Sequence, residues 1–293
     1  MIGPDDLGAW LGAEVAGTVL VTGNLSEVHV LRLADGREVV VKARPAEERL
    51  AGCAHVQRHL WLAGFPCPEP VAGPTRFGGQ ALSAELAVPG GPDPAPPAAG
   101  PTAALLARLI AAAPDARTTP TLRPSPPWIR WYHDEGPLWP RPDDRDADLN
   151  AEPSWHDAGA AAVRAGLARF DAPPVVGHCD FEAHNVWWRG GEPLAVHDWD
   201  SAVAEPEAVI VGVAAAMWPA GHGGRSGATV PESADFLDGY QRSTGRPWTA
   251  AEVRAAWAAG LWIRLFNDKK WSRDGLVTLS TVEAGERAAL AGL

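Results

Sequence analysis

The feature that most constrains this fold is the run from His178 to Asp200, which has the pattern of a tight hairpin with polar residues at both ends. The aromatic stretch 186–188 and a short apolar return flank a Gly-Gly turn, a pattern typical of two antiparallel strands. A hairpin brings the start of its first strand beside the end of its second. Asn185 and Asp198 are therefore expected side by side, with Asp180 one loop away.

The side chains expected at this end of the hairpin are hard oxygen donors. Asn185 and Asp198 offer amide and carboxylate oxygens of the kind that Mg²⁺ prefers, and Asp180 adds a separate carboxylate that can act as a base. The alternative is a chance Asp/Asn cluster on a solvated loop. Trp187 and Trp188 argue against it, because an exposed loop does not favour two tryptophans.

This arrangement resembles the catalytic core of the protein-kinase-like phosphotransferases. The aminoglycoside phosphotransferase family resembles it most, with its pattern His-x-Asp-x-x-x-x-Asn followed by a hydrophobic-Asp-Trp segment. His178, Asp180 and Asn185 fall on the first motif, and Asp198 falls on the second. The resemblance implies that Asp180 is the catalytic residue, that Asn185 and Asp198 bind Mg²⁺, and that ATP or GTP donates the phosphoryl group.

The resemblance also implies an α+β, protein-kinase-like two-lobed fold, with a small antiparallel sheet and one helix in the N-lobe and a mostly helical C-lobe carrying the catalytic hairpin. We expect a nucleotide-covering lobe over residues 1–88, a hinge and connector over 89–102, and a helical lobe with the catalytic and acceptor sites over 103–293. Apolar residues recur at helical spacing in three segments of that last lobe: 206–217, 232–242 and 250–266.

The small lobe is expected to contain strands at Thr18–Thr22, Glu27–Leu33 and Glu38–Lys42, the last two joined by an Asp-Gly turn. In the resembled family, the lysine that ends this strand meets the α- and β-phosphates of the nucleotide. Lys42 is therefore the candidate.

The first two strands are separated by Gly23-Asn24-Leu25-Ser26. Backbone N–H groups of such a turn can hold phosphates, with the hydroxyl of Ser26 adding a further donor. With only Gly23 as glycine, the segment also fits an ordinary hairpin turn.

The helix after the lysine strand lacks the mid-helix glutamate that the family uses to orient the lysine. We expect this helix from about Ala46 to Ala63, ended by Gly64-Phe65-Pro66. Its glutamates stand only at its start. Either Glu48 is drawn toward Lys42, or Gln57 takes the orienting role as a neutral partner.

The strand leading out of the small lobe is expected at Ala81–Ala87. In the resembled family, the backbone at this point, here from Glu85 to Ala87, hydrogen-bonds the adenine edge. The Pro-, Gly- and Ala-rich stretch Pro89–Pro101 that follows is typical of a connector between lobes.

Acidic residues near the motif are candidates for binding the acceptor. Glu182 lies inside the catalytic loop, Asp200 shares a face with Asp198 in an extended segment, and Asp268 lies near a helix end. Asp200 has two further interpretations, as an extra metal ligand or as the cap of the next helix.

The segment 124–155 combines tryptophans, Trp131 among them, with clustered carboxylates. Such a surface can cradle a cation or a sugar ring. The alternative is a proline-stiffened loop whose tryptophans pack into the large lobe with its acidic residues outside.

Composition limits the partners. The formal net charge of −11 argues against binding to nucleic acid or anionic lipid. No apolar run is long enough for a membrane span, and the three cysteines show no disulfide or zinc pattern. We expect a cytoplasmic enzyme that is a monomer or a dimer and binds a nucleotide and a small-molecule acceptor.

The expected function is transfer of the γ-phosphate of ATP or GTP to a hydroxyl of a small cationic molecule, such as an aminoglycoside-like antibiotic or amino sugar. One alternative is a metabolite kinase acting on an amino alcohol, sugar or amino acid. Another is a catalytically silent nucleotide-binding protein, which the missing helix glutamate favours and the complete Asp180, Asn185 and Asp198 set opposes. A protein kinase is disfavoured, because no activation segment ending in Ala-Pro-Glu follows Asp198.

Overall fold

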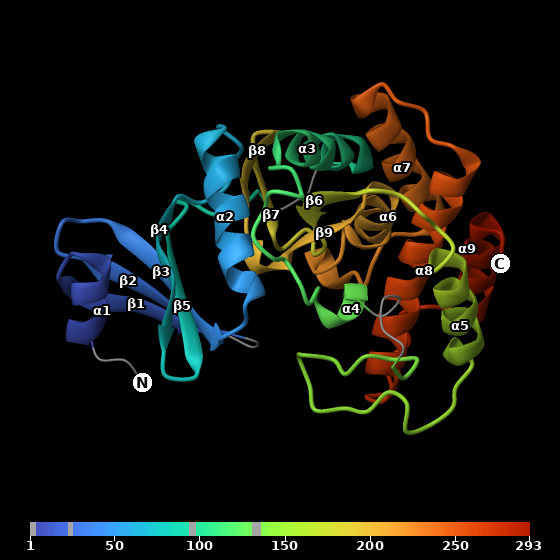
Figure 1. Cartoon of the computed structure of the whole chain (residues 1–293), viewed down its shortest axis with the longest axis horizontal. Helices are drawn as coiled ribbons and strands as arrows, with labels where there is room; N and C mark the ends of the chain where they lie inside the picture. Colours follow the sequence, from blue (N-terminus) through green and yellow to red (C-terminus); the bar gives the residue numbers. More distant parts are fainter. Residues whose placement is uncertain (1–3, 23–25, 94–97, 131–135) are drawn as a thin grey trace.

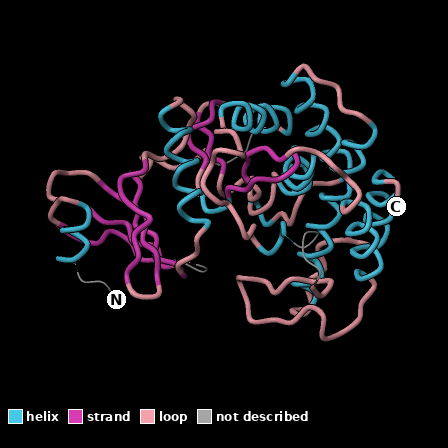
Figure 2. Tube along the Cα trace, in the orientation of Figure 1, coloured by secondary structure: helices cyan, strands magenta, loops and turns pink. Residues whose placement is uncertain are grey.

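Alternating apolar residues build the smaller of two lobes as an antiparallel sheet. The computed structural model describes residues 4–22, 26–93, 98–130 and 136–293. In Figure 1 the sheet occupies one end of the molecule and most helices gather at the other. The expected α+β, two-lobed organisation is confirmed, and Figure 2 shows the strands of the small lobe separated from the helical body.

The small lobe is a five-stranded sheet with strand order β1-β2-β3-β5-β4. Val39 and Val41 point inward from β3 and are buried, while Lys42 falls on the opposite face of the strand. The elements of this lobe are α1 (Pro4–Leu11), β1 (Val15–Thr22), β2 (Glu27–Leu33), β3 (Glu38–Pro45), α2 (Arg49–Leu62), β4 (Pro70–Phe77) and β5 (Gln80–Leu86).

Three strands and helix α2 of this lobe were predicted, and the hinge strand falls within one residue of its expected bounds. One helix was expected here, and the short helix α1 is a second one. Strand β4 was not predicted, because Pro70, Gly73 and Pro74 interrupt its apolar pattern. Prolines are tolerated there because β4 is an edge strand of the sheet.

The large lobe is mostly helical, with two short strand pairs at the side facing the sheet (Figure 1). Its helices are α3 (Ala99–Ala112), α4 (Pro127–Arg130), α5 (His156–Leu167), α6 (Glu207–Met217), α7 (Val230–Thr244), α8 (Ala250–Ser272) and α9 (Thr281–Ala291), with the short 3₁₀ turns η1 (Trp199–Ser201) and η2 (His222–Gly224). Its strands are β6 (Pro174–His178), paired with β9 (Ala202–Pro206), and β7 (Val186–Arg189), paired with β8 (Glu192–Val196).

The predicted catalytic hairpin is present as β7 and β8, with Val186 opposite Val196. The three predicted helices are also present as α6, α7 and α8. Helix α7 begins at a capping box of Thr229 and Glu232, and α8 begins at one of Thr249 and Glu252. Among the described residues, no helix has the length and apolar character needed to cross a membrane.

Helix α6 is the centre of the large lobe, and nearly all of its side chains are buried. It crosses α8 at a point where only glycine fits. The carbonyl group of Ala256 occupies the space that a Cβ on Gly212 would need, and the backbone of Gly212 in turn approaches Gly260. Small residues on both helices therefore set how closely they pack.

Replacing Gly212 with alanine is expected to lower the free energy of unfolding by about 1–3 kcal/mol, because the added methyl group meets backbone that cannot move aside. The matched control is Gly285→Ala in α9, where a Cβ has open space. There the helix preference of alanine is expected to raise stability by up to about 1 kcal/mol. Urea unfolding of both variants checks this, and equal stability changes would contradict it.

Candidate active site

The loop that follows β6 is held by a buried, neutral histidine. His178 Nε2 lies 3.0 Å from the carbonyl oxygen of His197 and 3.1 Å from that of Asp198, while its Nδ1 accepts from the amide of Asp180. Burial lowers the pKa of His178 to about 4. A neutral ring with its proton on Nε2 satisfies all of these groups, so His178 joins the catalytic loop to the end of β8.

Asp180 lies in this loop and is bound by Asn185. The Asn185 amide nitrogen donates to Asp180 Oδ2 at 2.9 Å and to the Asp180 carbonyl at 3.0 Å. Burial, followed by the charge of Asp198, raises the pKa of Asp180 to about 6. A carboxylate with a pKa near neutrality is suited to accept a proton.

Asp198 begins the turn after β8 in a left-handed backbone conformation, with φ of 63°. It is the one non-glycine residue with positive φ among those described, and such conformations collect at functional sites. The amide of its neighbour His197 donates to the carbonyl of Asn185 at 2.8 Å. The hairpin therefore brings Asn185 and Asp198 together, as expected.

These two residues fit a magnesium ion. Because the Asn185 amide nitrogen is used by Asp180, its carbonyl oxygen is the atom left to offer, and Asp198 offers carboxylate oxygens. Burial opposes ionisation of Asp198, but the charges of Lys42 and Arg44 hold its pKa below the usual range. An all-oxygen donor set with an ionised carboxylate is what Mg²⁺ binds.

Lys42 lies between two carboxylates. Its Nζ donates to Asp198 Oδ1 at 3.2 Å and lies 3.9 Å from Glu85 Oε1. Burial opposes its charge, but Glu85 and Asp198 raise the pKa of Lys42 above its usual range. The lysine is therefore a fixed cation at the boundary between the lobes.

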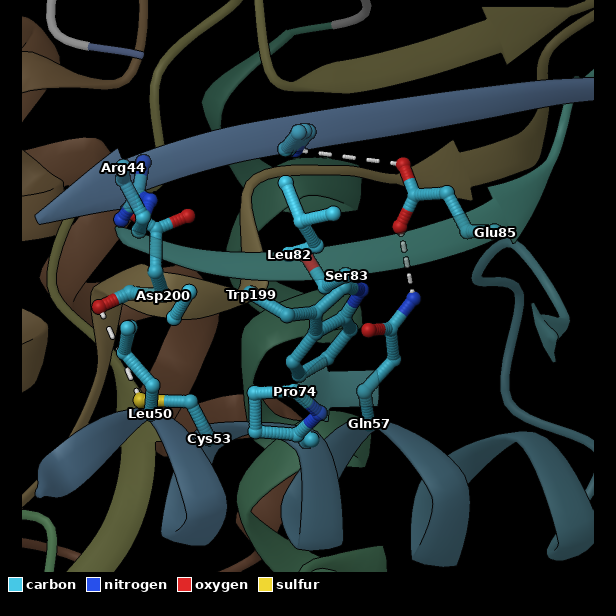
Figure 3. A pocket seen from close by; sticks show the side chains of 13 residues that line it. Arg44, Leu50, Cys53, Gln57, Pro74, Leu82, Ser83, Glu85, Trp199 and Asp200 are labelled. Atoms are coloured by element: carbon cyan, nitrogen blue, oxygen red, sulfur yellow. Dashed lines mark hydrogen bonds and ion pairs between the residues drawn. The ribbon is translucent and has the colours of Figure 1, made fainter. Parts of the chain in front are cut away.

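The orienting carboxylate comes from β5 and not from the start of α2. Glu48 is exposed, and among the described residues no ion pair joins it to Lys42. Gln57 instead donates to Glu85 Oε2 at 2.8 Å, so it acts on the lysine through Glu85. Figure 3 shows Gln57 rising from the helix toward Glu85 on the strand above. The expectation that Glu48 pairs with Lys42 is wrong, because this N-cap side chain is exposed and Glu85 lies beside the lysine instead.

A small cavity of about 50 Å³ lies behind Lys42, between α2 and the sheet. Figure 3 shows Trp199 and Asp200 closing it from the large lobe. Asp200 forms an ion pair with Arg44. It therefore lies in the wall of the small cavity behind Lys42 and not in the cavity beside Asp180, and the cap of α6 is Pro206. The expected substrate and capping roles of Asp200 do not agree with this position, and its metal role stays a prediction.

The hinge differs from expectation in its hydrogen bonding. The amide of Leu86 donates to Glu69 and that of Ala87 donates to Glu38, both at 2.9 Å. These two N–H groups are therefore engaged within the small lobe, and an adenine edge cannot use them in this conformation. The third residue of this stretch, Glu85, contributes its side chain, which lies beside Lys42.

Arg49 fastens α2 to the large lobe. It is 4% exposed, and it donates to the carbonyls of Ala202 at 2.7 Å and Leu122 at 3.3 Å, and to that of Asp200. Three carbonyl acceptors for one buried guanidinium form a strong, geometrically fixed contact. Helix α2 of the small lobe is therefore also held by the large lobe. Nothing in the sequence around Arg49 predicted this contact.

A second cavity, of about 420 Å³, lies beside Asp180. It is lined by carboxylates, two cations, aromatic rings and aliphatic side chains of α6 and α8. Its charged and aromatic members, with one amide, are Asp143, Asp144, Asp180, Glu182, His184, Arg225, Asn267, Lys270, Trp128, Phe266 and Trp271. Glu182 lies in this wall, as expected. Burial, followed by the charge of Asp180, raises the pKa of Glu182 well above its usual range.

Asp268 does not line this cavity. It is 2% exposed, and it lies 2.7 Å from His156 Nε2 and accepts the amides of Thr278 and Leu279. These bonds fasten the end of α8 to the segments packed on it. The expected substrate role of Asp268 is wrong, because a fully hydrogen-bonded buried carboxylate has no group left for a ligand.

The segment 124–155 packs into the large lobe through one tryptophan and lines the cavity with two carboxylates. Trp139 is 1% exposed and stacks on Trp262, which fits the packing interpretation. Asp143 and Asp144 line the cavity, which fits the cradle interpretation. The cluster of carboxylates in the sequence had marked these two residues as candidates for a binding surface. Trp131 and Gly23 lie outside the described residues, and Ser26 is half-buried just before β2.

Comparison with known proteins gives one family. The sequence profile of the phosphotransferase enzyme family matches residues 18–257, and no curated protein matches the chain. One similar solved structure is the amicoumacin kinase hAmiN in complex with AMP-PNP, Ca²⁺ and Ami, with 13% identity over 94% of this chain and 86% of that chain and a TM-score of 0.63. A thermostable mutant of the aminoglycoside phosphotransferase APH(4)-Ia has 18% identity over 99% of this chain and 98% of that chain, with a TM-score of 0.61. A putative fructosamine-3-kinase from Thermobifida fusca YX-ER1 has 18% identity over 98% of this chain and 97% of that chain, with a TM-score of 0.59. These likenesses confirm the kinase-like fold.

Replacing Arg49 with methionine is expected to lower the free energy of unfolding by about 2–4 kcal/mol, because three carbonyl groups lose a charged donor. The matched control is Arg58→Met, an exposed arginine of the same helix, with an expected change within about 0.5 kcal/mol. Denaturant unfolding of both variants checks this. A loss for Arg49→Met no larger than the control would show that the contact is unimportant.

Proposed function

The chain belongs to the phosphotransferase enzyme family, whose profile spans it from Thr18 to Trp257, and we propose that it transfers the γ-phosphate of ATP or GTP to a hydroxyl of a small cationic molecule. An aminoglycoside-like antibiotic or an amino sugar fits this description. The observation that carries the proposal is the position of Asp180. It lines the acceptor cavity and is bound by Asn185, which the hairpin places beside Asp198 and hence Lys42.

In the proposed reaction, Asp180 orients the acceptor hydroxyl and takes its proton. The hydroxyl oxygen forms a bond to the γ-phosphorus, and the bond from that phosphorus to the bridging oxygen breaks, with its electron pair leaving on the nucleoside diphosphate. The residues position and stabilise charge and form no covalent bond to phosphorus.

The donor side is built for anions. Asn185 and Asp198 would hold Mg²⁺, which when bound would neutralise charge on the β- and γ-phosphate oxygens. Lys42 supplies a fixed ammonium at the same place, and Glu85 with Gln57 keeps it there. Arg44, paired with Asp200, adds a second positive charge beside Asp198.

The acceptor side favours a cation. Asp143 and Glu182 join Asp180 in lining one cavity. The aromatic faces of Trp128, Phe266 and Trp271 line the same space. Carboxylates with aromatic rings are a suitable surface for an amine-bearing acceptor.

The test is a nucleotide-consumption screen of the protein with Mg-ATP and Mg-GTP against panels of aminoglycosides, amino sugars, amino alcohols and neutral sugars. Asp180→Ala is expected to lower turnover at least about a hundredfold while nucleotide binding survives. Asp171→Ala, an exposed aspartate before β6, is the control and should retain turnover. Full turnover by Asp180→Ala would refute the assignment, and nucleotide binding without any turnover would favour the silent alternative.

The pH profile gives an independent check. Asp180 acts in its ionised form, and burial raises its pKa to about 6. Activity should therefore be full well above pH 6 and fall, by up to about tenfold per unit, as the pH drops below it. We expect kcat/KM for the acceptor to follow this curve in the pH range where circular dichroism shows the protein folded. A flat profile down to pH 5 would contradict the role of Asp180.

A further inference from the structure

The turn of the catalytic hairpin contacts the chain where it leaves the sheet. Arg189, the last residue of β7, donates from Nη2 to the carbonyl oxygens of Pro89 at 2.6 Å and Gly91 at 3.0 Å. Gly90 lies between them with a φ of 87°, and a Cβ at this position would collide with the same guanidinium. The side chain of Arg189 therefore lies directly against the backbone that follows β5.

Asp93 adds a second attachment. Its Oδ2 accepts the amide of Gly190 at 2.7 Å, and its own amide donates to the carbonyl oxygen of Trp188, also at 2.7 Å. Trp188 is buried in the hydrophobic core of the large lobe. We call the four hydrogen bonds made by Arg189 and Asp93 the hinge clasp. The clasp fastens residues 89–93 to the large lobe.

The clasp leaves a short pivot between the two lobes. The amides of Leu86 and Ala87 donate to carbonyl oxygens of the small lobe, both at 2.9 Å. The clasp begins at the carbonyl oxygen of Pro89, so Val88 is the one residue between the two sets of hydrogen bonds. A change in the angle between the lobes is absorbed by a few backbone dihedral angles at such a point. The clasp therefore restricts the angles that the lobes can adopt.

The angle between the lobes determines the geometry of the donor side. Lys42 and Glu85 belong to the sheet, whereas Asn185 precedes β7 and Asp198 follows β8. The hairpin thus has two functions at its two ends. Its turn holds the chain that leaves β5, and its open end carries the proposed metal ligands.

We propose that Arg189 and Asp93 are positioning residues for nucleotide binding, because the hinge clasp holds the two halves of the donor side at the spacing that the nucleotide requires. This inference rests on the proposed function. Both residues act through the backbone of residues 89–93. Without the clasp, nucleotide binding itself has to order this segment, and the lost conformational entropy lowers the affinity.

The clasp contributes little to the stability of the folded lobes. The side chain of Arg189 is exposed, and residues 89–93 lie outside both hydrophobic cores of the described chain. Substitutions at exposed positions usually change the free energy of unfolding only slightly. Weaker nucleotide binding at unchanged stability therefore separates a positioning role from a purely structural one.

The experiment measures nucleotide affinity and stability on the full chain, with Arg189→Met and Asp93→Ala as the variants. Calorimetry gives the Kd for AMP-PNP with Mg²⁺, and kinetics give KM and kcat with Mg-ATP. We expect Kd and KM for the nucleotide to rise at least about fivefold, with kcat changed less than about twofold. The melting temperature should stay within about 2 °C of the wild type.

Conservative variants and a control test the assigned contacts. Asp93→Asn keeps an oxygen that can accept the amide of Gly190, and Arg189→Lys keeps a donor for the two carbonyls, so both should recover most of the affinity. Arg117→Met, an exposed arginine whose ion pair is with Asp115 two residues away, should leave the Kd unchanged. The double variant Arg189→Met/Asp93→Ala should lose less than the product of the two single effects, because both residues hold one segment.

A pair of glycines tests the clasp with Arg189 intact. Gly90→Ala places a Cβ against the guanidinium, whereas Gly91→Ala, at a φ of 66°, places one in open space. Both variants carry the strain of a left-handed backbone, so the difference between them reports the displaced arginine. Gly90→Ala should weaken AMP-PNP binding more than Gly91→Ala does.

Unchanged AMP-PNP affinity in both Arg189→Met and Asp93→Ala would overturn the inference. A lower melting temperature with kcat and affinity falling together, and no recovery in the conservative variants, would overturn it as well. A wild-type protein that binds no nucleotide would overturn both the inference and the proposed function. Weaker AMP-PNP binding in the variants without turnover of any acceptor would support the inference while the proposed transfer fails, so the two failures are distinguishable.

Discussion

The ion pair between Lys42 and Asp198 joins the two lobes at the point on which the proposed chemistry depends. The two residues are 156 positions apart, and their charged atoms lie 3.2 Å from each other in a partly buried setting. Solvent and salt screen such a pair less than a surface pair. Glu85, held by Gln57, adds a second carboxylate on the other side of the lysine. A fixed cation is thus in place without any rearrangement of the small lobe.

The surrounding contacts keep this pair in position and divide the site by charge. Arg49 binds carbonyls of the large lobe, and the carboxylate of Asp198 accepts a hydrogen bond from Lys42 of the sheet. On the donor side, Lys42 and Arg44 balance the local carboxylates. On the acceptor side, Asp180 and Glu182 remain without Lys or Arg partners among the described residues. A preorganised site of this kind favours an anion on one side and a cation on the other.

Much of the fold was predictable, because local pattern determines local structure. The alternation in Glu38–Lys42, the Gly-Gly turn of the hairpin and the helical spacing of 250–266 each gave the correct element. Edge strand β4, interrupted by prolines, and the short pair of β6 with β9 were not found. The pairing of β6 with β9 joins segments far apart in the chain, and such contacts leave little periodic signal in a short stretch.

The sequence alone determined that Asp180, Asn185 and Asp198 gather at one mouth, because a hairpin and a short loop fix their separation along the chain. Only the tertiary structure decided which carboxylate reaches Lys42, where Glu85 replaced the expected Glu48. Only the tertiary structure also showed that Asp200 forms an ion pair with Arg44 and that Asp268 contacts His156. The physical reason is that an ion pair between distant residues depends on how whole elements pack. Packing is a property of the folded lobes together and of no single segment.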